Sequence, residues 1–352
     1  MGYTPVSGEA LPRVGKRSPM WLHALLFVLT FASTMLAGTA WIGQNWLEVT
    51  NITHGLTYAV LLMLFLSAHE FGHYIAARRH GVDVSLPYFI PMPLLWLLPF
   101  GTMGAVIRTR QAIPSRTVLF DIGVAGPLAG FVVCLAILAV GFATLPPIDY
   151  LYQIHPEYRM NGMLTTGMYF GDTIVFSAMR SVFAQGASFI PPMNEIYHYP
   201  FLCVGWFGLF VTALNMLPFG QLDGGHVLYA LIGERQFRVA RILWWCLFVA
   251  GMLSLLGVVQ ELLSEPSPEG FVIWLQHSIL PALDAMKRTI PWMFTLGDGW
   301  LIWAILIRFV IRIPHPPVAD DVPLSPTRKI VGWFAIAVLI VSFTPRMIYF
   351  VQ

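Results

Sequence analysis

The sequence predicts an all-α polytopic membrane protein with about seven transmembrane helices and a re-entrant β-hairpin or loop after the second. Three observations lead to this fold class. The 352 residues are 57% hydrophobic and only 11% charged, whereas soluble domains carry about 25% charged residues. Apolar runs long enough to cross a bilayer recur along the chain. The run after the second of these is broken by prolines. The net charge of +2 gives no support to nucleic-acid binding.

The expected spans are apolar runs separated by polar or proline-containing connections. The first run is too long for the apolar region of a signal peptide and has no clear cleavage site, so we expect it to remain as a span. The polar residues before it, 1–19, form the expected cytoplasmic tail. With the N-terminus inside, most of the 20 Lys and Arg residues lie on the cytoplasmic side. The seven expected spans cover residues 20–42, 56–77, 118–145, 201–217, 242–263, 299–311 and 330–349.

The segment 82–116 is apolar but cannot form one helix, because prolines interrupt it. The stretch 101–109 alternates loosely and is compatible with a strand. We therefore expect a re-entrant loop with a short strand or hairpin. Irregular backbone at membrane depth is tolerated only where it lies against protein or water. The interrupting prolines are Pro87, Pro91, Pro93 and Pro99.

The third expected span carries a face of small side chains that permits close approach of another helix. Its members are Gly123, Ala125, Gly126, Ala129 and Gly130. The connection that follows, residues 146–200, is expected to lie outside the cytoplasm. It is too short and irregular to predict as a separate domain.

The pattern H-E-x-x-H occurs near the end of the second expected span, in Ala-His-Glu-Phe-Gly-His at residues 68–73. On a helix, His69 and His73 are four residues apart on one face, so both imidazoles can reach one metal ion. Glu70 lies beside them and can act as a general base toward a water molecule. Imidazoles and a carboxylate are costly at membrane depth. This cost favours a functional site over a chance match on a polar helix.

Hydrolytic zinc sites usually have three protein ligands and an open position for water. Asp223 is the candidate third ligand, because the fourth expected span ends near it at the same depth as the two histidines. The alternative is a turn residue at a helix end, a common role for Asp before Gly. Asn215 is a candidate donor to a developing oxyanion or to the substrate backbone. Its alternative role is capping or packing before Pro218.

Two patterns together resemble the site-2 protease family of intramembrane zinc metalloproteases. They are H-E-F-G-H in one span and N-x-x-P-x-x-x-L-D-G-G in a later span. The run Ala-Gly-Pro-Leu-Ala-Gly at residues 125–130 also resembles that family. The resemblance extends over roughly residues 56–225, and the outer spans are not diagnostic.

The resemblance implies that His69, His73 and Asp223 bind one zinc ion per chain and that Glu70 is the catalytic acid and base. It also implies a re-entrant β-hairpin after the motif helix, which residues 87–109 fit. Residues 20–225 would then form a membrane-embedded metalloprotease core. Residues 226–352 would form a C-terminal membrane region.

The expected function is hydrolysis of peptide bonds in or near transmembrane segments of single-span membrane proteins, in the context of regulated intramembrane proteolysis. A helical peptide bond is shielded, so the substrate has to unwind, and a strand at 101–109 can pair with it. The alternatives are a metal transporter or channel, and an inactive scaffold that binds transmembrane helices. The expected location is a bacterial plasma membrane, because no Ser- and Arg-rich transit peptide is evident.

The remaining histidines divide into two groups. His226 directly follows Asp-Gly-Gly and either orients Asp223 or makes a hydrogen bond at a helix end. The others have no partner at metal-binding spacing in the sequence, and we interpret them as interfacial or loop residues: His23, His54, His155, His198, His277 and His315.

Overall fold

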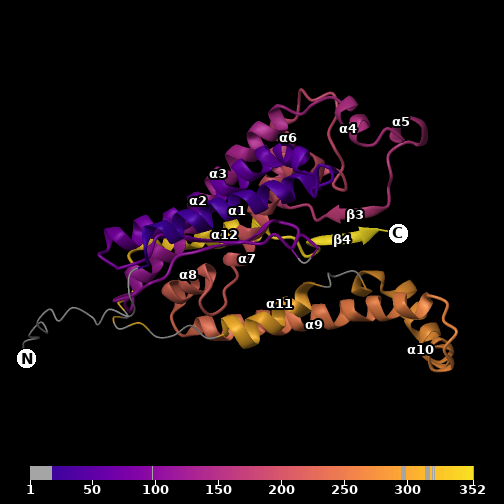
Figure 1. Ribbon diagram of the computed structural model, residues 1–352. Helices are drawn as coiled ribbons and strands as arrows, with labels where there is room; N and C mark the ends of the chain where they lie inside the picture. Colours follow the sequence, from indigo (N-terminus) through magenta and orange to yellow (C-terminus); the bar gives the residue numbers. More distant parts are fainter. Residues whose placement is uncertain are drawn as a thin grey trace, which may run out of the picture.

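The computed structural model describes residues 18–96, 98–294, 299–313, 318, 320 and 322–351. Almost all of the expected N-terminal tail, and His315, lie outside the described residues. The described chain is mostly helical, with two small antiparallel sheets. Figure 1 shows α1, α2, α3, α7 and α12 as one bundle, with the α9 and α11 pair running along one side of it. These helices are α1 (Met20–Trp41), α2 (Leu56–Arg79), α3 (Arg116–Ala143), α7 (Pro200–Asn215), α9 (Arg235–Ser264), α11 (Gly299–Leu306) and α12 (Pro326–Ser342).

The main hydrophobic core lies where α2, α3 and α7 pack together. Aromatic side chains fill it, and Phe65, Trp206 and Phe207 are among its fully buried members. Small residues on α3 allow the close approach that the sequence predicts. A Cβ atom on Gly130, for example, would lie 3.1 Å from the Phe65 ring. Burial of this apolar surface therefore fixes α2 against α3, and α2 carries the H-E-x-x-H motif.

Short polar signals set the helix ends around this core. Ser115 precedes α3, and its hydroxyl accepts a hydrogen bond from the backbone N–H of Val118. Ser325 caps α12 in the same way, and Pro326 occupies the first turn, where its missing N–H costs nothing. Both capped helices, α3 and α12, therefore begin at residues whose chemistry favours a helix start. A 3₁₀ helix (Val49–Gly55) leads into α2.

Four described helical segments are long and apolar enough to cross a membrane. They are α1, α2 with the 3₁₀ helix before it, α3 and α9. The expected fourth and sixth spans are shorter helices: α7 has 16 residues, and α11 has 8 residues followed by a π-helical turn (Ile307–Ile311). The fold class is thus confirmed as mostly helical with several candidate spans, whereas the count of seven is not supported by helix length.

The expected seventh span is wrong at its C-terminal end. α12 ends at Ser342, and the chain then forms β4 (Ile348–Val351). β4 pairs antiparallel with β3 (Gly167–Phe170) from the 146–200 connection. The stretch is apolar enough to continue a helix, but β-branched and aromatic residues also suit a strand. The pairing partner, which lies far away in sequence, decides between the two.

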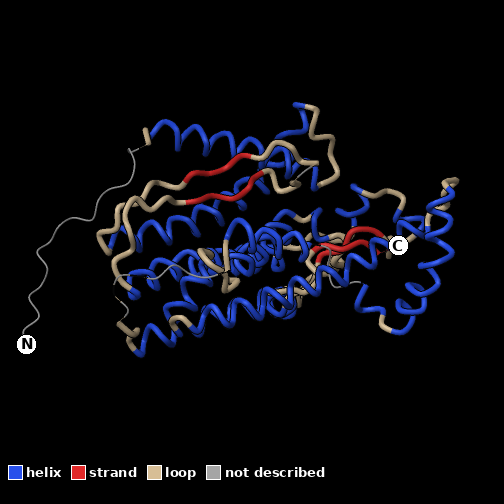
Figure 2. Tube along the Cα trace, turned by 90° about the horizontal axis from the view of Figure 1, so that it is seen from below, coloured by secondary structure: helices blue, strands red, loops and turns tan. Residues whose placement is uncertain are grey.

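The proline-containing segment contains an antiparallel strand pair instead of a continuous helix, and its re-entrant position in a membrane stays a prediction. β1 (Tyr88–Pro91) pairs antiparallel with β2 (Thr102–Val106), with an irregularity between Phe89 and Pro91. Figure 2 shows this strand pair well apart from the β3–β4 pair. Side chains of α1 bond to hairpin carbonyls: Ser33 donates to Gly101 O at 2.6 Å and Trp41 Nε1 donates to Pro99 O at 2.9 Å. These bonds hold the hairpin against α1.

The helices α9 to α11 form a more exposed arm beneath the bundle in Figure 1. α8 (Asp223–Ile232) follows α7 and leads into α9, which packs along α11 and against α10 (Gly270–Thr289). The sequence analysis predicts no helix for α10. Only 11% of the most apolar stretch of α9 is buried inside the protein. A small cluster with Phe219 and Trp300 joins this arm to the end of α7.

The 146–200 connection is more regular than expected. It contains α4 (Asp149–Ile154), α5 (Tyr158–Asn161), β3, α6 (Ile174–Phe183) and a 3₁₀ turn (Ile196–His198). α6 packs on α3 and α12. In Figure 1, α4 and α5 lie at one end of the bundle and α8 lies toward the other.

Candidate metal centre

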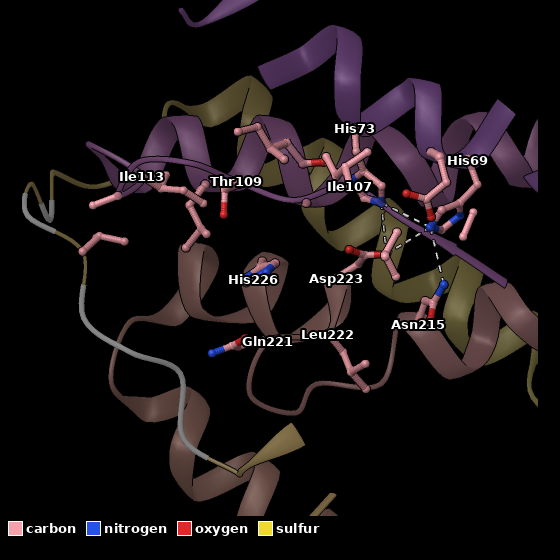
Figure 3. Close-up of a pocket in the computed structure, with 18 residues that line it drawn as sticks. His69, His73, Ile107, Thr109, Ile113, Asn215, Gln221, Leu222, Asp223 and His226 are labelled. Carbon is pink, nitrogen blue, oxygen red and sulfur yellow. Dashed lines mark hydrogen bonds and ion pairs between the residues drawn. The ribbon is translucent and has the colours of Figure 1, made fainter. Parts of the chain in front are cut away.

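A cavity of about 890 Å³ opens where α2, α3 and α8 meet the end of β2. All five site residues predicted from the sequence line it. Figure 3 shows the two imidazoles on one side, facing Asp223 and Asn215 on the other. His69, His73 and Glu70 come from α2, Asn215 from the last residue of α7, and Asp223 from the first residue of α8.

Three atoms in this cavity form a nearly equilateral triangle. The Nε2 atoms of His69 and His73 are 3.2 Å apart, and each is 3.3 Å from Asp223 Oδ2. Ligands at about 2.0–2.1 Å from a tetrahedral zinc ion are separated by about 3.3 Å. Both histidines are buried, and Asp223 is partly buried. The three residues therefore have the atoms, spacing and shielding that would fit a zinc ion.

The orientation of the His73 ring is set by the neighbouring helix. Its Nδ1 donates to the backbone carbonyl of Ile122 on α3 at 2.7 Å. This bond leaves the lone pair of Nε2 directed at the triangle, which is the usual support for a metal-binding histidine. The Nδ1 atom of His69, by contrast, is buried and has no hydrogen-bond partner in the described part of the chain.

A glycine on α3 makes room for the same ring. A Cβ atom at Gly126 would lie 2.1 Å from His73 Nε2, far inside van der Waals contact. The small face predicted on this span thus brings α3 within contact distance of the histidines. It also makes the position of His73 depend on the α2–α3 packing.

Glu70 and Asn215 line the same cavity as the triangle. Glu70 is only 7% exposed, and Ile107, just after β2, lines the cavity with it. Asn215 Nδ2 lies 3.4 Å from His69 Nε2. A buried carboxylate and an amide donor thus share the cavity with the three candidate ligands.

The chain reverses sharply between Asn215 and Asp223, and two glycines make this possible. A Cβ atom at Gly224 would lie 1.8 Å from Met216 O, and one at Gly225 would lie 2.6 Å from Gly220 O. The α7–α8 loop therefore folds directly against the first turn of α8. This fold returns Asp223 to the end of α7.

Several lining residues were not singled out by the sequence analysis. Gln221, Thr109 and Ile107 reach the cavity from the α7–α8 loop and from the chain after β2, and Ile122 acts through its backbone carbonyl. No residue-type signal reveals a backbone acceptor. His226 also lines the cavity, one turn after Asp223.

Comparison with known proteins identifies the family of the chain. A family model for peptidase family M50 matches residues 57–256, a range that contains every residue of the triangle. "Probable zinc metalloprotease EGY2, chloroplastic" of Oryza sativa subsp. indica is 28% identical over 306 residues, covering 85% of this chain and 51% of that protein. "Probable zinc metalloprotease EGY1, chloroplastic" of Arabidopsis thaliana is 33% identical over 182 residues, covering 51% of this chain and 30% of that protein. No solved structure matches significantly.

The chain spans about half the length of the first of these relatives. The relatives are named as chloroplast proteins of plants. This conflicts with the expected bacterial plasma membrane, so that assignment is withdrawn. It rested on the absence of a transit-peptide pattern in the sequence, which is a weak signal.

Proposed function

The chain belongs to peptidase family M50, and from this membership we propose that it is a zinc-dependent endopeptidase that cleaves peptide bonds in or near transmembrane segments. The observation that carries the proposal is the triangle of His69, His73 and Asp223, with edges of 3.2, 3.3 and 3.3 Å. It lies in a cavity of about 890 Å³, beside helices long and apolar enough to cross a bilayer.

We assign the zinc-binding role to the three triangle residues and the role of general base and acid to Glu70. A zinc ion, when bound, would supply Lewis-acid polarisation of the scissile carbonyl and acidify a water molecule. Glu70 accepts a proton from the attacking water and later delivers it to the leaving amine, so the proton count balances. Its burial keeps the carboxylate close to the reacting atoms and away from bulk solvent.

Asn215 has the position of a hydrogen-bond donor in this scheme. Its amide lies beside His69, at the edge of the triangle. From there it can donate to the developing oxyanion or to a substrate carbonyl. Removing one such donor typically costs about 10²–10³-fold in rate.

The hairpin supplies a way to hold an unwound substrate. β2 pairs with β1 on one edge only among the described strands, and Ala105, Val106 and Ile107 line the cavity. A substrate segment that adds to the free edge of β2 would satisfy its own backbone groups, which lipid cannot do. Proline substitutions at alternate positions of β2 should therefore impair cleavage and leave zinc content intact.

The substrates we propose are single-span membrane proteins, and the setting is regulated intramembrane proteolysis with the N-terminus of this chain in the cytoplasm. The charge distribution of the sequence supports this orientation. His80 and Arg328 both bond to Asp121, so the end of α2 and the start of α12 meet at one face. In the proposed orientation this face is cytoplasmic.

The decisive experiment is cleavage of a model single-span substrate by the purified protein in detergent, with Glu70→Gln as the matched variant. We expect cleavage by the wild type, loss of cleavage in the variant, and equal zinc content in both. Equal cleavage by both proteins would show that a contaminating protease is responsible. Cleavage by neither, with no zinc in the wild type, would overturn the proposed metal centre.

A further inference from the structure

We propose that the 146–200 connection carries a second metal site, formed by His155, Glu195 and His198 and suited to a zinc-like divalent cation. This cluster lies outside the candidate centre, near α4 and α5 at the other end of the bundle (Figure 1). The proposal is independent of the peptidase function, because it uses none of the residues that line the large cavity.

The geometry of the three ligand atoms fits one ion. The Nε2 atoms of His155 and His198 are 3.0 Å apart, and His198 Nε2 is 3.6 Å from Glu195 Oε2. These separations lie on either side of the roughly 3.3 Å expected between ligands of a tetrahedral zinc ion. All three atoms lie within 4.8 Å of one another. Two imidazoles and one carboxylate leave a fourth position for water.

Glu195 provides an observation that hydrogen bonding within the protein does not explain. Its side chain is 1% exposed, yet Oε2 has no hydrogen-bond partner among the described residues. The other oxygen, Oε1, accepts a hydrogen bond from the Tyr158 hydroxyl at 2.8 Å. A buried carboxylate oxygen without a donor is costly. A cation between Glu195 and the histidines would remove this cost.

Two of the three side chains, those of His155 and Glu195, have outer contacts of the kind that commonly support metal-binding residues, whereas His198 Nδ1 is buried and has no hydrogen-bond partner among the described residues. His155 Nδ1 faces Glu157 Oε1 at 3.0 Å, so a proton on Nδ1 is donated outward and the Nε2 lone pair faces the cluster. Tyr158 fixes the Glu195 carboxylate. His155 can therefore present its Nε2 lone pair to an ion, and His198 Nε2 lies 3.0 Å from that nitrogen.

A metal at this position would have a clear structural effect. His155 and His198 are 43 positions apart, so one ion would close a long loop between α3 and α7. Such closure removes conformational freedom from the unfolded chain. The His155 side chain is 27% exposed, which gives an ion a route from solvent.

The test is zinc stoichiometry of the full-length protein in detergent, after chelator stripping and equilibrium dialysis against micromolar zinc. We expect two zinc ions per wild-type chain and one in His155→Ala and in Glu195→Gln. Glu195→Gln keeps an acceptor for Tyr158 and nearly the same volume, so it guards against loss of folding. His54→Ala, at an exposed histidine elsewhere, is the matched control and should bind two.

The proposal is overturned if both cluster variants bind as many zinc ions as the wild-type chain, whatever that number is. Loss of an ion in the control would also overturn it, because the ion would then lie elsewhere. A cobalt-loaded sample adds a spectroscopic readout. The absorption of tetrahedral cobalt should fall by about half in His155→Ala if both sites are tetrahedral.

Discussion

Two clusters in this protein present the same set of ligand types, two imidazoles and one carboxylate, in different surroundings. The cluster on α2 and α8 lines a large cavity and has Glu70 and Asn215 beside it. In the cluster of the 146–200 connection, His155 contacts Glu157, and Glu195 accepts a hydrogen bond from Tyr158. No described residue there has the role of general base that we assign to Glu70. The comparison indicates that similar ligand geometry would suit catalysis in the proposed peptidase centre and loop closure in the proposed second site. The surrounding groups make the distinction.

The largest effect should come from Asp223→Asn. An amide is a far weaker zinc ligand than a carboxylate, so the variant should lose zinc from the cavity cluster. Cleavage of the model substrate should fall by at least about 10³-fold, since polarisation of the carbonyl and acidification of the water by the metal are lost. Zinc analysis should show a loss of one ion per chain. Unchanged cleavage would remove Asp223 from the metal centre.

A strong effect is also expected from Gly126→Ala, because the new methyl group would overlap the His73 ring. We expect cleavage to fall by about 100-fold, as a displacement of 1 Å at a reacting group can cost this much. Overpacking should also lower the free energy of unfolding by about 1–3 kcal/mol. Cleavage rates measure the first effect, and thermal melts measure the second.

The matched control for that variant is Gly186→Ala. A Cβ atom at Gly186 meets nothing within 4 Å, so cleavage and melting temperature should remain near wild type. Equal losses in both variants would mean that the α2–α3 contact at Gly126 has no special importance.

A smaller effect is expected from Tyr158→Phe in the loop cluster. The substitution removes the hydroxyl that holds Glu195 Oε1 but keeps the ring that stacks on His155. Loss of such an orienting group typically lowers metal affinity by about 10–100-fold. A zinc titration should show weakening of one site and no change in the other. Weakening of both sites, or of neither, would contradict the separation of the clusters.

The smallest effect should come from His80→Ala. His80 pairs with Asp121 at 2.9 Å, but both side chains are more than one-fifth exposed. Exposed ion pairs contribute about 0–1 kcal/mol, and Asp121 keeps its two bonds to Arg328. Chemical denaturation should show a change below about 1 kcal/mol, with zinc content unchanged. A loss of zinc in this variant would contradict the prediction, because it would mean that the partly exposed pair of His80 and Asp121 contributes to metal binding.

Much of the helical architecture follows from the sequence, because an apolar run of about 20 residues in lipid has few alternatives to a helix. The runs that became α1, α2, α3 and α9 illustrate this. Prolines also excluded a continuous helix over residues 82–116, and the choice between a loop with a short strand and a hairpin was left to the structure, which pairs β1 with β2. The strand β4 was not, because its residues suit a helix or a strand equally and only pairing with β3 selects the strand. α10 was missed because its apolar pattern is mixed with charges such as Asp284 and Lys287.

The same distinction applies to the two metal clusters. The sequence by itself determined the spacing of His69 and His73, because four residues on a helix place two side chains on one face at a fixed distance. Only the tertiary structure brought the Nε2 atom of His155 to 3.0 Å from the Nε2 atom of His198. The sequence analysis predicts both as interfacial or loop residues, and the sequence alone could not show that they meet. Their separation along the chain carries no information about distance in space, which is set here by contacts such as the hydrogen bond from the Tyr150 hydroxyl of α4 to the His198 carbonyl.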